Sequence, residues 1–282
     1  MNKLSIITVN YKSRELTRLL LKGIQQCNLE LPFECILVNN SPADGTVEMA
    51  NENFPWVKAL DAPGNIGYGA GINLGMKQVS GEFVLILNAD TVVFPGQIEK
   101  LVAAAEAMPR AGLLGPRMEN PNRSMQRTFC RFPTLFTPVY RRTVLGRTPW
   151  GKSELERYLM HDADHEQAML ADWIIGGCLL MRREALEALG GFDERFFMYF
   201  EDVDICRRTW EAGWQVVYFP HARFVHYHHR ESDVRRPWQV LTNRTSRIHI
   251  TSAVKYFLKY WGKPLPDSRP GAAVVCPVRQ KL

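Results

Sequence analysis

The sequence has no long apolar run. Its longest apolar stretches, LSIITV at 4–9 and FVLILNA at 83–89, are far shorter than the roughly 20 residues of a membrane-spanning helix. The first of them stops at Asn10, which is typical of a strand and not of the core of a signal peptide. We therefore expect neither a membrane span nor a secretion signal in this chain of 282 residues.

Closely paired cysteines are also missing. The six cysteines, at positions 27, 35, 130, 178, 206 and 276, include no CxxC pair. Such pairs are typical of zinc sites, and disulfide frameworks belong mainly to small secreted domains. The pattern therefore favours reduced thiols in a cytoplasmic protein.

Acidic residues are scarce in one part of the chain. From Arg110 to Arg157 there are ten Lys and Arg but three Asp and Glu, an excess of +7 in a chain of net charge +6. Apolar residues interrupt this basic segment, as in FCRFPTLFTPVYRR at 129–142. Two interpretations stay open: a solvated basic loop, or a surface that faces membrane headgroups or a phosphorylated acceptor. We do not expect nucleic acid, because no known nucleic-acid-binding motif accompanies the charge.

The first third of the chain alternates strands and helices. Apolar, β-branched runs predict strands at 4–11, 33–40, 57–63 and 81–90. Helices are predicted at 94–109 and after Ser13, which would cap a helix with Leu16, Leu19, Leu20 and Ile24 on one face. This order indicates an α/β fold with a mainly parallel sheet flanked by helices.

The rest of the chain is less regular. Residues 116–165 predict loops and short helices, followed by strands near 172–182 and 214–220 and helices at 183–189, 202–212 and 244–262. The last twenty residues contain four prolines, which predicts a loose tail over 263–282. We expect one domain over 1–262, with a nucleotide-sugar-binding half at 1–115 and a smaller acceptor and catalytic half at 116–262.

Polar residues end three of the predicted strands, in VNY, VNN and LNAD. Ligands of parallel α/β sheets gather at the carboxyl ends of the strands. Asp90 ends the strongest strand, and Mg²⁺ often takes one or two carboxylates together with phosphate oxygens of a substrate. Asn88 would point to the same side of this strand. The alternative is that Asp90 is a turn or capping residue.

A glycine-rich stretch, NIGYGAGINLGM at 65–76, leads into a predicted helix. Glycines let the backbone approach a ligand, and exposed amides at a helix N-terminus favour phosphate. The spacing is not that of the dinucleotide-binding fingerprint, so an ordinary turn is the alternative.

A third motif, FFMYFEDVDICRR at 196–208, places Glu201, Asp202 and Asp204 directly after aromatic residues. The carboxylates could cap the helix that follows and complement its dipole. Alternatively, crowding of like charges raises the pKa of one carboxylate, which then serves as a general base for a sugar hydroxyl. The histidine-rich stretch HARFVHYHHRES at 221–232 allows either a metal ligand or a structural histidine.

These motifs lie in a fixed order: SIITVNYKS, VNNSPADGT, NIGYGAGINLGM, LNAD, WIIGGCLLMRREALEALGGFDERFFMYFEDVDICRR and FVHYHHRES. Together they resemble the family 2 glycosyltransferases, whose fold is called GT-A. The resemblance covers residues 3 to about 262, and its block at 173–208 is highly specific. RIHITSAVKYFLKYWG and the spacing of His226, Arg230 and Ser232 are similar to the rhamnosyltransferase branch.

The resemblance implies inverting transfer from a nucleoside-diphosphate sugar, and it gives each motif a function. Asp202 would be the catalytic base, and Asp90 and His226 would bind a divalent cation, Mg²⁺ or Mn²⁺. The nucleotide-sugar would contact Thr8, Val9, Asn10, Asn39, Asn40, Asn65, Gly67, Asn73, Asn88, Ala89 and Asp90. The acceptor would contact Trp173, Gly176, Gly177, Glu201 and Arg230.

Two residues depart from the family pattern. Asn39 stands where the family commonly has Asp, which affects recognition of the nucleobase. Asn88 replaces the first Asp of the metal motif and leaves Asp90 as the main protein ligand, so the metal would bind weakly without nucleotide.

The expected donor is dTDP-rhamnose, and the acceptor is a lipid-diphosphate-linked saccharide or a growing surface polysaccharide. We expect a cytoplasmic enzyme that contacts the inner face of the membrane through 110–157. Two other functions are weighed against this one: a nucleotidyltransferase, and an inactive module that binds nucleotide or glycan.

Overall fold

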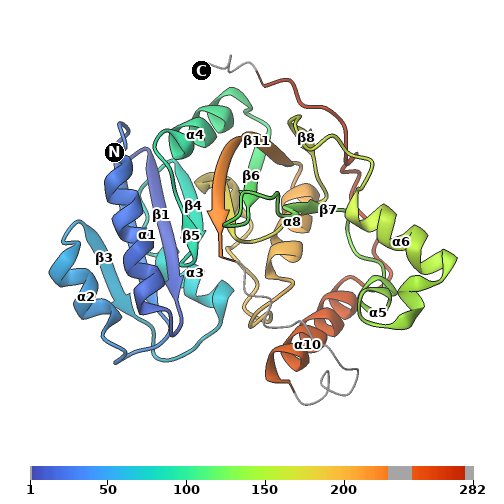
Figure 1. The fold of residues 1–282 in the computed structure, drawn as a ribbon, viewed down its shortest axis with the longest axis horizontal. Helices are drawn as coiled ribbons and strands as arrows, with labels where there is room; N and C mark the ends of the chain where they lie inside the picture. The colour runs from blue at the N-terminus through green and yellow to red at the C-terminus, as the bar shows by residue number, and fades with distance from the viewer. Residues whose placement is uncertain (1, 228–242, 277–282) are drawn as a thin grey trace.

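The computed structural model describes residues 2–227 and 243–276. Its centre is a mixed β-sheet with helices packed around it (Figure 1). The strand order is β3-β2-β1-β4-β10-β6-β11-β5, and β8 pairs with β11. These strands are β1 (Leu4–Asn10), β2 (Phe33–Asn39), β3 (Val57–Asp61), β4 (Phe83–Asn88), β5 (Thr91–Val92), β6 (Ala111–Glu119), β8 (Met169–Leu170), β10 (Cys178–Arg182) and β11 (Gln215–His226).

The N-terminal half of the sheet is parallel, as predicted. β1 pairs in parallel with β2 and β4, and β2 pairs in parallel with β3. The register brings Asn10 opposite Asn39, and Val9 opposite Asn88. The polar ends of these strands therefore meet at one edge of the sheet, and the expected α/β fold is confirmed.

The other half of the sheet contains a strand that the sequence analysis missed. β6 lies between β10 and β11, with β10 antiparallel and β11 parallel to it. Its sequence, AGLLGPRME, includes Gly115 and Pro116, which normally argue against a central strand. Gly115 is required here because a Cβ at this position would lie 2.1 Å from Cγ2 of Ile174, in the neighbouring strand β9 (Trp173–Ile174).

Helices follow most of the strands. They are α1 (Arg14–Cys27), α2 (Thr46–Asn53), α3 (Tyr68–Met76), α4 (Gln97–Ala107), α5 (Thr137–Arg142), η1 (Val144–Arg147), α6 (Pro149–Leu159), α7 (Arg183–Ala188), α8 (Glu201–Glu211) and α10 (Arg244–Lys259). A separate two-stranded sheet joins β7 (Phe129–Cys130) to β9.

The predicted details of α1 are confirmed in part. Leu20 and Ile24 are buried as predicted, whereas Leu19 is 63% exposed. Ser13 is the N-cap residue, as predicted, but within the described residues its side chain makes no capping hydrogen bond. The buried amide of Asn10 holds the start of the helix, since its Oδ1 accepts hydrogen bonds from the backbone N–H of Ser13 and from Oγ1 of Thr17.

The C-terminal segment is not loose throughout. The backbone N–H groups of Gly271 and Val274 donate to the carbonyls of Leu170 and Ala168, and Leu170 N–H donates to Ala272. The hydroxyl of Ser268 also donates to the buried carboxylate of Asp172. This part of the tail therefore extends the sheet beside β8, while residues 277–282 lie outside the described residues.

The expected division after residue 115 falls inside β6, so both halves share one sheet. The single domain over 1–262 stays a prediction. None of the helices over 2–227 and 243–276 is long and apolar enough to cross a membrane.

Candidate active site

The two expected metal ligands lie side by side at the carboxyl end of β4. Asp90 follows β4 directly, and His226 is the last residue of β11. Nε2 of His226 lies 3.1 Å from Oδ1 of Asp90, and the amide nitrogen of Asn88 lies 3.4 Å from the same ring nitrogen. Pairing of His226 with Thr91 between β11 and β5 fixes this arrangement.

Gln126 contacts the other nitrogen of the histidine ring. Its Oε1 lies 3.2 Å from Nδ1 of His226, and its amide donates a 2.6 Å hydrogen bond to the His226 carbonyl. The orientation of a metal-binding histidine depends on the partner of its second ring nitrogen. Gln126 therefore fixes the orientation of the His226 ring, and the sequence analysis missed this contact because nothing in NRSMQRTF at 122–129 distinguishes Gln126.

The turn at Gly176 and Gly177 connects this pair to Asp202. The N–H of Gly176 donates a 3.1 Å hydrogen bond to Oδ2 of Asp202. A Cβ on Gly177 would lie 3.3 Å from Cε1 of His226, and a Cβ on Gly176 would lie 3.6 Å from Oδ2 of Asp202. The turn thus contacts the expected base on one side and the expected metal ligand on the other.

Tyr68 provides a second connection, which the sequence analysis also missed. Its hydroxyl donates a 2.6 Å hydrogen bond to Oδ1 of Asn88 and lies 3.4 Å from the Gly176 carbonyl oxygen. Burial raises the pKa of Tyr68 well above 10, and the charges of Glu201, Asp90 and Asp202 raise it further. Asp90 and Asp202 are far apart in the chain, but the charges of both raise the pKa of the same Tyr68 hydroxyl.

Glu201 and Asp202 differ in their electrostatics. Burial, followed by the charge of Asp202, raises the pKa of Glu201 well above its usual 4.5, and Oε2 of Glu201 has no hydrogen-bond partner among the described residues. Burial also raises the pKa of Asp202, to about 6, against the effect of hydrogen bonds from the N–H groups of Val203 and Gly176. Hydrogen bonds from two backbone N–H groups therefore favour the ionised form of Asp202, whereas burial favours the protonated form of Glu201.

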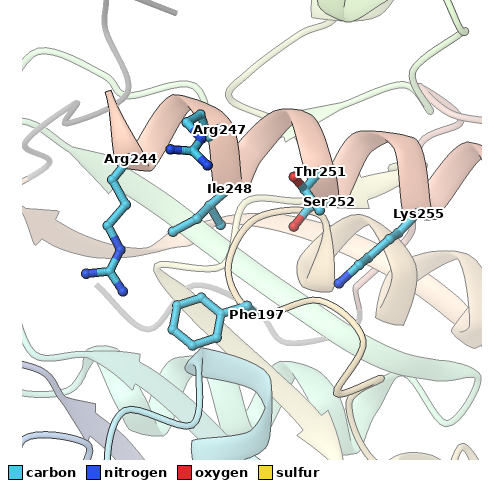
Figure 2. Close-up of a pocket in the computed structure, with 7 residues that line it drawn as sticks. All are labelled: Phe197, Arg244, Arg247, Ile248, Thr251, Ser252 and Lys255. Atoms are coloured by element: carbon cyan, nitrogen blue, oxygen red, sulfur yellow. The ribbon is translucent and has the colours of Figure 1, made fainter. Parts of the chain in front are cut away.

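The loop before Glu201 has a strained backbone and lies between Tyr68 and a cavity. Tyr199 and Phe200 have φ values of 67° and 66°, which bulky residues rarely adopt and which are typical of functional sites. The carbonyl of Phe197 accepts a 2.9 Å hydrogen bond from Tyr68 N–H. On its other side, Phe197 lines a cavity of about 460 Å³ beneath α10 (Figure 2).

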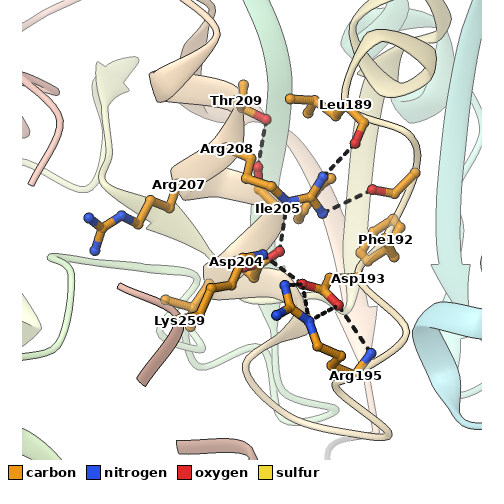
Figure 3. Close-up of polar contacts among 12 residues, drawn as sticks. Leu189, Phe192, Asp193, Arg195, Asp204, Ile205, Arg207, Arg208, Thr209 and Lys259 are labelled. Atoms are coloured by element: carbon orange, nitrogen blue, oxygen red, sulfur yellow. Dashed lines mark hydrogen bonds and ion pairs between the residues drawn. The ribbon is translucent and has the colours of Figure 1, made fainter. Parts of the chain in front are cut away.

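Asp204 does not belong to the cleft, so the expected crowding of three carboxylates is wrong. Its side chain is 0% exposed and faces the cations of Arg208, at 2.7 Å, and Lys259, at 2.5 Å (Figure 3). Tyr260 donates a further 2.8 Å hydrogen bond to it. Since Arg208 also donates to the carbonyls of Leu189 and Gly191, Asp204 joins α8 to α10 and to the turn after α7.

Several of the expected nucleotide-binding side chains are engaged within the protein. Asn10 donates to Asn39, Asp44 and Thr46, and Asn39 donates to Ser41, Asp44 and Asp61. Thr8 and Val9 are buried in β1, and the buried Asn40 donates to the Gly67 carbonyl. These residues shape the edge of the sheet. Asp61 is exposed at the end of β3, and the sequence analysis missed it although it lies within the strand predicted at 57–63.

Other expected site residues have structural contacts. Asn73 exchanges hydrogen bonds with the backbone of Phe192 and donates to Glu194, so it holds the loop after α7. Trp173 is buried, and its indole N–H donates to the Arg131 carbonyl. The exposed Asn65 accepts from Gly67 N–H, and Ala89 is half-buried beside Asp90. Arg230 lies outside the described residues.

The residues at this edge fit a divalent cation that is shared with a substrate. Asp90 supplies a carboxylate oxygen and His226 a ring nitrogen, 3.1 Å apart. In the part of the chain that the structure describes, no group of three His, Cys, Asp or Glu could hold a metal by itself. Such a two-ligand site matches the way in which Mg²⁺ is bound together with substrate phosphates.

Known proteins resemble both the sequence and the fold. A relative from Mycobacterium tuberculosis, named N-acetylglucosaminyl-diphospho-decaprenol L-rhamnosyltransferase, is 34% identical over 84% of this chain and 79% of its own length. The structure of GalNAc-T7 with UDP, GalNAc and Mn²⁺ has a TM-score of 0.64 at 14% identity and covers 93% of this chain, which spans 49% of GalNAc-T7.

A mannosyltransferase from Pyrobaculum calidifontis in complex with GDP-Man and Mn²⁺ has a TM-score of 0.56 at 16% identity, over 92% of this chain and 75% of its own. At these identities the two structures show the shared fold alone. The model named "N-terminal domain of galactosyltransferase" matches residues 160–230. The model of glycosyl transferase family 2 matches residues 5–190, more than half of the chain. The chain therefore belongs to family 2 of the glycosyltransferases.

Proposed function

We propose that this glycosyltransferase moves rhamnose, with inversion, from dTDP-rhamnose to a lipid-diphosphate-linked saccharide. The printed name of the M. tuberculosis relative supports both the sugar and the kind of acceptor. The observation that carries the chemistry is the position of Asp202: its carboxylate accepts a hydrogen bond from the same turn that contacts His226.

The donor would lie along the carboxyl edge of the sheet. Backbone groups near Thr8, Val9 and Asn10 would face the nucleoside, with Asn39 and Asn40 fixing their positions. The exposed carboxylate of Asp61 is suited to accept a hydrogen bond from an N–H of the nucleobase. It would thereby replace the aspartate that the family commonly has at the position of Asn39. The glycine loop at Asn65 and Gly67 would approach the ribose and diphosphate, supported by Asn73, and Asn88 and Ala89 would line the strand end.

Asp90 and His226 would hold the divalent cation, as expected from the sequence. When bound, the cation neutralises the charge that develops on the leaving diphosphate. The Mn²⁺ in the two related structures is consistent with this type of site. Gln126 keeps the His226 ring facing Asp90, and the hydroxyl of Tyr68 keeps Asn88 in place.

Asp202 would act as the general base in a single displacement. Its carboxylate accepts the proton of the acceptor hydroxyl while that oxygen forms a bond to the anomeric carbon, and the bond from this carbon to the diphosphate oxygen breaks with its electron pair. The products are a glycoside of inverted configuration, the nucleoside diphosphate and a protonated Asp202. Two backbone N–H groups fix the carboxylate, so little reorganisation is needed.

The acceptor would enter beside the Gly176–Gly177 turn. The absence of side chains at these two positions leaves room next to Asp202. Burial favours the protonated form of Glu201, which would limit the local negative charge, and Trp173 would support the turn from the core. Arg230 stays a predicted acceptor contact.

We further propose a cytoplasmic enzyme that binds the membrane peripherally through 110–157. This basic segment exposes a set of apolar side chains, which supports insertion among lipid headgroups. They are Leu135, Phe136, Val139, Val144, Leu145 and Trp150.

A donor panel tests this function. We expect the protein with Mg²⁺ or Mn²⁺ to transfer rhamnose from dTDP-rhamnose to N-acetylglucosaminyl-diphospho-prenol, and to use UDP- and GDP-sugars at least about a hundredfold less efficiently. The coupling constants of the product should show an inverted anomeric centre. Preference for another donor would contradict the sugar assignment, and absence of both transfer and donor hydrolysis would indicate an inactive binding module.

A further inference from the structure

The cavity beneath α10 is lined by positive charge. Arg244, Arg247 and Lys255 lie along one side of it, with Phe197 opposite (Figure 2). Ile248, Thr251 and Ser252 complete the lining. Such a cluster is suited to bind a phosphate or diphosphate.

These cations are not neutralised by the described part of the chain. Lys259, one turn beyond Lys255, is ion-paired with Asp193 and Asp204, whereas across 2–227 and 243–276 no ion pair involves Arg244, Arg247 or Lys255. Lys255 does donate a 2.8 Å hydrogen bond to the Arg195 carbonyl. The lining of the pocket therefore carries an excess of positive charge, whereas the cations around Asp204 are paired with carboxylates.

Phe197 separates this pocket from the donor side of the cleft. Its carbonyl accepts from Tyr68 N–H, and a Cβ on Gly67 would lie 2.6 Å from the same carbonyl oxygen. The hydroxyl of Ser252 donates to the carbonyl of Met198, which ties α10 to the same loop. Because this loop leads directly into Glu201 and Asp202, a ligand in the pocket would lie against the segment that carries the expected base.

An apolar stripe runs along α10 next to the pocket. It consists of residues four positions apart, which lie on one face of a helix at 3.6 residues per turn. This face is adjacent to the one that carries Arg244 and Lys255, and its side chains point to solvent, with Leu258 68% exposed. The stripe comprises Ile250, Val254 and Leu258, and the exposed Trp261 follows just after the helix, which ends at Lys259.

We propose that α10 is the binding site for a polyprenyl diphosphate, with the diphosphate in the cationic pocket and the first isoprene units along the apolar stripe. A nucleoside diphosphate matches the cations but leaves the stripe without a partner, and its place in the proposed mechanism is at Asp90 and His226. The assignment of this ligand to the acceptor rests on the proposed function, but its binding to α10 does not depend on any transfer reaction.

Calorimetry with three probes tests the proposal on the full chain: farnesyl diphosphate, farnesol and inorganic diphosphate. We expect farnesyl diphosphate to bind at least about tenfold more tightly than either of the others. Arg244→Gln with Arg247→Gln should weaken its binding about ten- to a hundredfold, as expected for lost hydrogen bonds to a charged ligand. Val254→Ser with Leu258→Ser should weaken it at least about fivefold, and both variants should bind dTDP with Mn²⁺ as the parent does.

Matched controls are Arg18→Gln and Leu19→Ser on α1, where Leu19 is 63% exposed, close to the 68% of Leu258. Both should leave farnesyl diphosphate binding unchanged. Thermal unfolding checks that each variant is folded, and the milder Lys255→Gln replaces the double variant if that one unfolds.

Three results would overturn the proposal. Equal loss of dTDP affinity in the pocket variant would assign the cations to the donor. Inorganic diphosphate binding as tightly as farnesyl diphosphate, with no effect of the stripe variant, would indicate a general phosphate site. Unchanged farnesyl diphosphate binding, with loss of binding to phosphatidylglycerol vesicles, would indicate a membrane contact. Farnesyl diphosphate binding without rhamnose transfer would instead refute the proposed function and leave this site standing.

Discussion

At the scale of single residues, the three carboxylates of FFMYFEDVDICRR differ because of their partners. Asp204 is neutralised by Arg208 and Lys259, Glu201 is buried and forms no ion pair in the described part of the chain, and Asp202 is held by two backbone N–H groups. Successive helical residues point about 100° apart, so neighbours in the sequence face different surroundings. The motif could be recognised from the sequence, but only the packing of α10 and the Gly176 turn separates the three functions.

The pH dependence of transfer should report Asp202. Because burial raises the pKa of Asp202 to about 6, protonation removes the base as the pH falls through that value. We expect kcat/KM to be constant above about pH 7 and to decrease tenfold per pH unit below about 6. An ordinary aspartate would keep activity to about pH 4. Constant activity at pH 5, with the protein folded by thermal unfolding, would contradict a raised pKa of the base.

Asp204 should matter for stability. Asp204→Asn leaves Arg208 and Lys259 without their buried partner, a change that typically costs about 3–5 kcal/mol. We expect Tm in differential scanning calorimetry to decrease by roughly 5–10 °C. The control is Glu187→Gln on α7, where the carboxylate is 54% exposed and pairs with Arg183, which is 39% exposed. This change should cost about 1 kcal/mol or less. Equal effects of both substitutions would show that Asp204 does not hold α8 to α10.

At the scale of the elements, strands and helices with clear periodicity were predictable, and β6 was not. The runs that became β1, β2 and β4 are apolar and end in polar residues. β6 contains Gly115 and Pro116, which reflect contacts that only the folded chain makes: Gly115 makes room for Ile174. In the same way, the prolines of the tail predicted a loose segment, although part of the tail pairs with β8.

Gly115→Ala tests why this strand carries a glycine. A new Cβ at 2.1 Å from Ile174 must displace a core side chain, and such overpacking costs about 1–3 kcal/mol. Denaturant unfolding should show this loss. In the Ile174→Ala background, where the clashing atoms are absent, Gly115→Ala should cost less than half as much. Equal costs in both backgrounds would show that the strain lies elsewhere.

At the scale of the whole molecule, the ordered motifs predicted the family, and the fold class followed from the strand and helix order. What the sequence could not supply were contacts between distant segments: Gln126 behind His226, Tyr68 between Asn88 and Gly176, and Asp61 at the sheet edge. It also could not show that the side chains of Asn10 and Asn39 hold the strand ends together, and their contact with a ligand stays a prediction. Because β4 and β10 are neighbours, the Gly176–Gly177 turn that contacts Asp202 lies beside Asn88, which supports the proposal that Asp90 and Asp202 share one site.

The most direct test of this shared site compares Asp202→Asn with Asp90→Asn, by calorimetric binding of dTDP with Mn²⁺ and by single-turnover transfer. For Asp202→Asn we expect a dissociation constant within about threefold of the parent and transfer slower by about a hundred- to ten-thousandfold, the usual contribution of a general base. For Asp90→Asn we expect both binding and transfer to be lost. If Asp202→Asn weakens nucleotide binding as much as transfer, or transfers sugar at the parent rate, Asp202 is not the base.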